Sequence, residues 1–175
     1  MILMIKRLQK TRLNTSSTLK YLILLSSLSF SAILYAATPE QIKTAVQAEE
    51  TAYLNTLKTL VNIESGSKDI EGLNQIAKVV ADQLKAVGAE VNIINSTDIY
   101  RMDDTPEKMG PMVKAVLKGQ GKSKIMMIAH MDTVYQRGML KNQPFKVDGN
   151  QVYGLGIIDD KQGVASILHV LNTLK

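Results

Sequence analysis

Apolar residues recur at helical spacing in three stretches of the chain. The first spans residues 38–61 and opens on a threonine followed by a proline, a favoured start for a helix. The second spans residues 70–87, and Gly88 directly after it suits a helix end. The third spans residues 163–174. The pattern therefore predicts three helices.

Short apolar runs between the helices predict strands. Residues 91–94 form the first, and residues 124–129 are predicted to form a buried strand because five of the six side chains are apolar. Glycine-containing turns join the remaining runs into two predicted hairpins, whose strands are residues 112–117 with 124–129 and residues 145–147 with 151–153. The alternation of helices and strands predicts a layered α/β domain.

Positive charge is concentrated near the start of the chain. Residues 1–36 contain lysines and arginines but no acidic residue, and they account for the whole formal net charge of +5. Residues 37–175 are therefore formally neutral, and they carry no basic stripe with interleaved aromatic residues. These features exclude a nucleic-acid partner. The length of 175 residues allows one domain, or at most two small ones.

Residues 1–36 have the order of a secretory signal peptide. A basic segment precedes the apolar run 21–35, which ends at Ala36-Ala37. We expect cleavage after Ala36, export to the periplasm or the medium, and only a transient contact with the membrane. An uncleaved anchor is the alternative, although the run is short for a membrane span and contains four serines.

Candidate metal ligands follow two of the predicted strands. His130 stands at the end of residues 124–129, and Asp132, two residues later, can either bind a metal or orient the imidazole ring. The pair Asp159-Asp160 follows a glycine-rich turn after the second hairpin. An imidazole combined with carboxylates is typical of a hydrolytic zinc site, whereas a closed structural site normally uses cysteine, which this chain lacks.

Both segments match motifs of a known enzyme family. Residues 130–134 read H-x-D-T-V, and residues 153–163 read Y-G-x-G-x-x-D-x-K-x-G. From Thr38 to its last residue the chain resembles the zinc-dependent exopeptidases and deacylases related to glutamate carboxypeptidase, acetylornithine deacetylase and succinyl-diaminopimelate desuccinylase. Residues 62–67, 69–72 and 130–135 resemble the glutamate carboxypeptidase branch most.

The resemblance implies a role for each candidate residue. His130 binds one zinc ion, Asp159 bridges both ions of a two-zinc site, and Asp132 is the catalytic residue that orients His130. Asp160 receives no role. The implied fold is a three-layer domain with a mixed central sheet, and the implied reaction is removal of a C-terminal amino acid, glutamate, from a small peptide or N-acyl amino acid. The implied assembly is a homodimer.

Other parts of the family pattern have no counterpart in the chain. They are a glutamate pair that supplies the general base, a further acidic ligand, a distant histidine and an inserted domain. We therefore interpret residues 37–175 as the N-terminal part of a truncated catalytic domain, and the alternative function is that of a non-catalytic fragment. His169 is predicted to be a packing or solvent-edge residue and Glu49 to lie on a solvated face. Lys161 is either exposed to solvent or neutralises the adjacent carboxylates.

Overall fold

A computed structural model of the protein describes residues 37–174. The predicted signal segment lies outside the described residues, so its assignment stays a prediction. The chain divides into two units after Thr38, and the described helices and strands all belong to the second unit. Among the described helices, none has the length and apolar character needed to cross a membrane.

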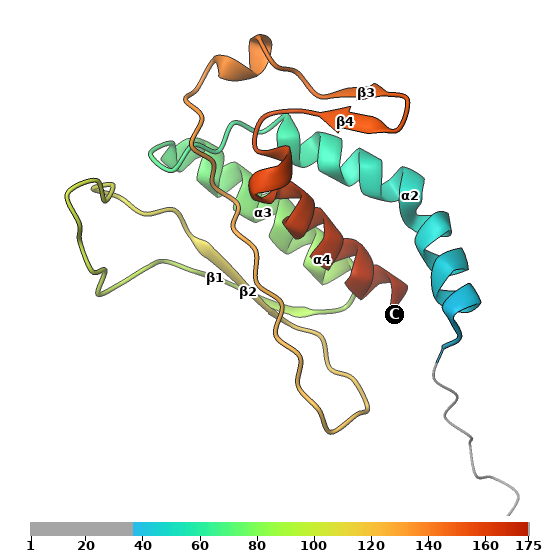
Figure 1. Cartoon of the computed structure of the whole chain (residues 1–175). Helices are drawn as coiled ribbons and strands as arrows, with labels where there is room; N and C mark the ends of the chain where they lie inside the picture. Colours follow the sequence, from blue (N-terminus) through green and yellow to red (C-terminus); the bar gives the residue numbers. More distant parts are fainter. Residues whose placement is uncertain (1–36, 175) are drawn as a thin grey trace, which may run out of the picture. The chain divides into compact units, whose positions relative to one another are not determined.

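The three predicted helices are confirmed (Figure 1). They are α2 (Pro39–Val61), α3 (Ile70–Ala86) and α4 (Gln162–Thr173). Asp69 caps α3 by accepting a hydrogen bond from the backbone N–H of Gly72. Gly88 follows this helix with a φ of +88°, a left-handed conformation in which glycine is favoured.

The apolar core lies between these helices. Helix α4 packs against both α2 and α3, and α3 also packs against the sheet formed by residues 90–94 and 112–116. Burying each aliphatic side chain contributes roughly 1.5–3 kcal/mol. The least exposed core side chains come from all three helices and are Leu60, Val61, Ile76, Ala77, Ala81 and Ala165. The remaining described segments pack against this stable layer of helices.

Two small antiparallel sheets complete the fold (Figure 1). Strands β1 (Glu90–Ile94) and β2 (Met112–Val116) form the first, and β3 (Lys146–Asp148) and β4 (Gln151–Tyr153) form the second. The second predicted hairpin is thus confirmed. The first was wrong, because β2 pairs with β1 instead of residues 124–129. The described residues form helices with two separate two-stranded sheets, an arrangement compatible with an α/β class but without the predicted mixed central sheet.

Residues 124–129 do not form the predicted buried strand. They are extended, but no backbone hydrogen bond joins them to another described segment. The apolar side chains of residues 125–128 face solvent, since Ile125 is 85% exposed, Met126 82% and Ile128 78%, whereas Ala129 is partly buried against the core. An apolar run predicts burial only if a neighbouring element covers it, and in the described part of the chain no strand pairs with these residues.

Candidate metal centre

The structure brings the three candidate residues together. The Nε2 atom of His130 lies 2.8 Å from Oδ1 of Asp159. On the other side of the ring, Nδ1 lies 3.1 Å from Oδ1 of Asp132 and 3.1 Å from the backbone oxygen of the same residue. The imidazole is therefore placed between two carboxylates that are 27 positions apart in sequence, and both of its nitrogens have an acidic partner.

A tight turn carries Asp159 to this position. Strand β4 leads through Gly156, which has a φ of +66°, into the turn η2 (Ile157–Lys161). A Cβ atom on Gly156 would lie only 2.4 Å from Cγ2 of Thr133. Glycine thus allows the Asp159 segment to approach the His130 segment. Asp160 follows with its Oδ2 atom 3.4 Å from the backbone nitrogen of His130.

The connection between α2 and α3, residues 62–69, holds the segment that contains Asp132. The backbone N–H of Thr133 donates to Ser65, and the N–H of Ser67 donates to Thr133, which forms a parallel bridge centred on Gly66. The Ser65 hydroxyl donates to the backbone oxygen of Met131. The Ser67 hydroxyl donates to Oδ2 of Asp132 at 2.6 Å. We call residues 62–69 the α2–α3 connection.

The same connection holds the loop that follows the first motif. Arg137 makes two hydrogen bonds to Asp69, at 2.8 and 2.7 Å, which lower the pKa of that carboxyl. Oε1 of Glu64 accepts hydrogen bonds from the backbone N–H groups of Gly138 and Leu140, at 2.7 and 2.9 Å. These bonds to Leu140 and Gly138 hold the pKa of Glu64 below its usual value.

Lys161 attaches the Asp159 segment to this connection as well. Its side chain is 1% exposed, and Nζ donates to the backbone oxygen of Ile63 at 2.6 Å. Burial lowers the pKa of Lys161 to about 8, and the nearby charge of Glu64 opposes that shift. Of the two alternatives for Lys161, exposure to solvent is therefore wrong. Both candidate metal-binding segments are anchored to the same short stretch of chain.

The candidate donor atoms are of the chemical types that bind zinc. Imidazole nitrogen and carboxylate oxygen are common zinc ligands, and catalytic zinc usually has three protein ligands. Within residues 37–174 no group of three or more such side chains is close enough to hold a metal. Burial opposes protonation of His130, but hydrogen bonds to Asp159 and Asp132 outweigh it and raise the pKa of the ring. A bound metal would therefore compete with a proton for Nε2.

Comparison with known proteins identifies the family. Residues 126–175, which include all three candidate residues, match the peptidase family M20/M25/M40. Carboxypeptidase G2 from Pseudomonas sp. (strain RS-16) is 38% identical over 131 residues, which is 75% of this chain. Both comparisons support the M20 peptidase family for this chain. It spans 30% of the length of that relative.

The two comparisons agree with the resemblance found in the two motifs. The family consists of peptidases, so a hydrolase is the enzyme class that both comparisons support. Neither comparison tests the role of an individual residue. The assignments of His130, Asp132 and Asp159 therefore rest on the motifs and on the distances between their side chains.

His169, the other histidine within residues 126–175, lies outside the candidate metal centre. Nδ1 of His169 is 2.5 Å from Oε2 of Glu49, and Nε2 is 2.9 Å from the hydroxyl oxygen of Thr56. His169 packs between α4 and α2. This agrees with a packing residue, one of the two environments predicted for it. Glu49 is not on a solvated face, because its carboxylate also accepts a hydrogen bond from Asn172. The two residues are 120 positions apart, so no local sequence pattern predicts their contact.

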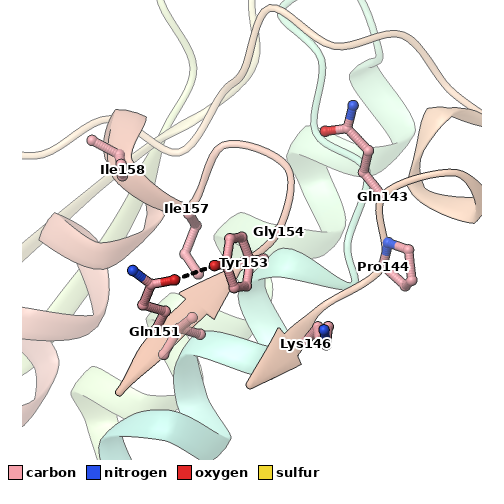
Figure 2. Close-up of a pocket in the computed structure, with 9 residues that line it drawn as sticks. Gln143, Pro144, Lys146, Gln151, Tyr153, Gly154, Ile157 and Ile158 are labelled. Atoms are coloured by element: carbon pink, nitrogen blue, oxygen red, sulfur yellow. Dashed lines mark hydrogen bonds between the residues drawn. The ribbon is translucent and has the colours of Figure 1, made fainter. Parts of the chain in front are cut away.

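A surface hollow of about 670 Å³ lies beside the second hairpin (Figure 2). Within it the Tyr153 hydroxyl donates a hydrogen bond to Oε1 of Gln151. Neither His130 nor Asp159 lines this hollow, so it is separate from the candidate metal centre. Its lining residues come from the chain before β3, from the hairpin and from the start of η2, and they are Gln143, Pro144, Lys146, Gln151, Val152, Tyr153, Gly154, Ile157 and Ile158.

Proposed function

We propose that the protein is a zinc-dependent carboxypeptidase that hydrolyses the amide bond to a C-terminal glutamate by metal-activated water. The observation that carries the proposal is the position of the His130 ring, with Nε2 beside Asp159 and Nδ1 beside Asp132. Zinc bound there would supply a Lewis acid that polarises the scissile carbonyl and lowers the pKa of its water.

The side chains have distinct tasks in this proposal. Asp132 accepts a hydrogen bond from the Nδ1–H group of His130, which fixes the tautomer and leaves the Nε2 lone pair available for the metal. Asp159 presents a carboxylate with two oxygens, the kind of ligand that can bridge two ions. The carboxylates also place negative charge around a dication, which favours its binding.

Two kinds of support point to the substrate class. The matched relative is named a carboxypeptidase, so the action on a C-terminal residue is taken from that protein to this one. The preference for glutamate comes from the resemblance of residues 62–67 and 69–72 to the glutamate carboxypeptidase branch. We propose small peptides and N-acyl amino acids as substrates.

A non-catalytic chain that binds metal remains the second candidate. One observation favours it: within residues 37–174, no three histidine, aspartate or glutamate side chains are arranged so that they could hold a metal ion. Zinc binding without amide hydrolysis is the result that this candidate predicts.

The test measures zinc content and glutamate release together. The purified protein is incubated with zinc and with an N-acyl-glutamate, and with the matching N-acyl-lysine as a substrate control. In a protein that carries these residues together with the missing general base, we expect glutamate release, and loss of both zinc and activity in His130→Ala and Asp159→Asn. Asp104→Asn, at an exposed loop position, is the matched control and should behave as the wild type. Retention of full activity by Asp159→Asn would contradict the proposed role of Asp159.

We also propose that the protein is exported to the periplasm or the medium, on the basis of the basic and apolar order of residues 1–36. N-terminal sequencing of the exported protein should begin at Ala37. If the protein were found only in the cytoplasm, with Met1 still at its N-terminus, export would be refuted. Assembly into a homodimer stays a prediction from the resemblance.

A further inference from the structure

We propose that Ser67 is a positioning residue that fixes the carboxylate of Asp132 against the ring of His130. This inference rests on the proposed function, because it concerns how the candidate metal ligand is oriented. The two oxygens of Asp132 have different partners. Oδ2 accepts a hydrogen bond from the Ser67 hydroxyl at 2.6 Å, and Oδ1 lies 3.1 Å from Nδ1 of His130.

Packing alone does not hold this carboxylate in place. The side chain of Asp132 is 42% exposed and that of His130 is 50% exposed. The terminal torsion of an aspartate has a broad energy minimum, so a half-exposed carboxylate rotates easily unless a hydrogen bond restrains it. The hydroxyl of Ser67 supplies that restraint from the side opposite the imidazole.

Ser67 is itself firmly placed. Its backbone N–H donates to Thr133 at 2.9 Å, and the neighbouring Gly66 forms the parallel bridge with Thr133. A Cβ atom on Gly66 would lie 2.3 Å from the backbone oxygen of Tyr135, so glycine permits this close approach. The position of the hydroxyl therefore follows from the backbone contacts of residues 66 and 67.

The hydroxyl has a second possible acceptor. The backbone oxygen of Thr133 lies 3.2 Å from it, compared with 2.6 Å for Oδ2 of Asp132. A bond to an ionised carboxylate is shorter and about twice as strong as a bond to a neutral carbonyl. The carboxylate is therefore the preferred acceptor, and the proton of Ser67 points to Asp132.

Ser65, two positions earlier, has a different task. Its hydroxyl donates to the backbone oxygen of Met131, so it holds the chain and not the carboxylate. The α2–α3 connection thus uses one serine for the backbone beside Asp132 and another for its side chain. Removal of the Ser67 hydroxyl should change the orientation of Asp132 and leave the path of the chain intact.

The experiment follows the His130 ring in the metal-free protein and zinc affinity in the same variants. Nitrogen-15 NMR of the two histidines reports which ring nitrogen carries the proton, and a chelator competition gives the zinc dissociation constant. In Ser67→Ala we expect less Nδ1–H tautomer of His130 and roughly tenfold weaker zinc binding, the lower end of the loss when an outer partner of a ligand is removed. Ser67→Thr, which keeps a hydroxyl, should restore both.

Ser123→Ala, at an exposed loop position, is the matched control and should change neither measurement. Circular dichroism checks the fold, and Ser67→Val, which lacks the hydroxyl and has the shape of the Ser67→Thr side chain, replaces Ser67→Ala if that variant is unfolded. Wild-type ring signals and zinc affinity in a folded Ser67→Ala would overturn the inference. Failure of the wild type to bind zinc would refute the proposed function, and the ring signals of the metal-free protein would still decide the role of Ser67.

Discussion

The chain on the two sides of His130 differs strongly in how it is held. Before the histidine, residues 124–128 are exposed, and residues 124–129 have no backbone partner in the described part of the chain. After it, residues 131–140 are bonded repeatedly to the α2–α3 connection. Figure 1 shows the extended segment crossing the helices before the chain reaches the second hairpin.

This difference shows that the candidate metal centre is organised by the segment after the histidine. The sequence places His130 at the end of an apolar run, which predicts that a strand positions it. In the structure the contacts come from Ser65 and Ser67 to the first motif and from Lys161 to the second. The geometry of the site therefore depends on the α2–α3 connection and on the helical core beneath it.

The largest expected effect is the difference in stability loss between a substitution in the core and one in the exposed segment before His130. Ile76 is 0% exposed, and Ile76→Ala should lower the free energy of unfolding by about 2–5 kcal/mol, because it leaves a cavity among the helices. Ile125 is 85% exposed, and Ile125→Ala should change stability by no more than about 0.5 kcal/mol. Urea unfolding measures both. Equal losses would show that residues 124–129 are covered in solution.

The next effect tests the close approach between the α2–α3 connection and the first motif. Gly66→Ala places a Cβ atom 2.3 Å from the backbone oxygen of Tyr135, so the two segments must separate. We expect a loss of about 1–3 kcal/mol, in the range for overpacked sites, together with weaker zinc binding. Gly121→Ala is the control, since no atom lies within 4 Å of its added Cβ. Unchanged zinc affinity in Gly66→Ala would show that the α2–α3 connection does not organise the site.

The smallest effect concerns the pH dependence of the loop after the first motif. Hydrogen bonds from Leu140 and Gly138 lower the pKa of Glu64 in the folded protein. Its contribution to stability is therefore complete above the pKa of the unfolded chain, about 4.3, and is lost as the pH falls through the lower folded value. Urea unfolding from neutral to acidic pH should show this decline.

Glu64→Gln should flatten the decline, because glutamine does not titrate. Glu50→Gln, at an exposed position on α2, serves as the control and should leave the pH profile unchanged. An identical decline in the wild type and in Glu64→Gln would assign the acid sensitivity to other carboxyls, of which Asp69 is the first to test.

Much of the local structure could be predicted from the sequence. The three helices, β1 and the second hairpin follow from apolar spacing and glycine-containing turns, which act over a few residues. The meeting of His130, Asp132 and Asp159 agrees with the two motifs. The predictions that were wrong concern partners and surroundings: β2 pairs with β1, residues 124–128 are exposed and Glu49 is paired with His169. Of the two alternatives for Lys161, solvent exposure is wrong because the side chain is buried.

The sequence by itself therefore determined which residues form helices and which family the two motifs resemble, and it indicated the candidate metal ligands. Only the tertiary structure decided what holds those side chains. Ser67 and Asp132 are 65 positions apart, and Lys161 and Ile63 are 98 apart. No local pattern encodes such pairs, because they form only when the packing of α2, α3 and α4 brings the α2–α3 connection to both motifs.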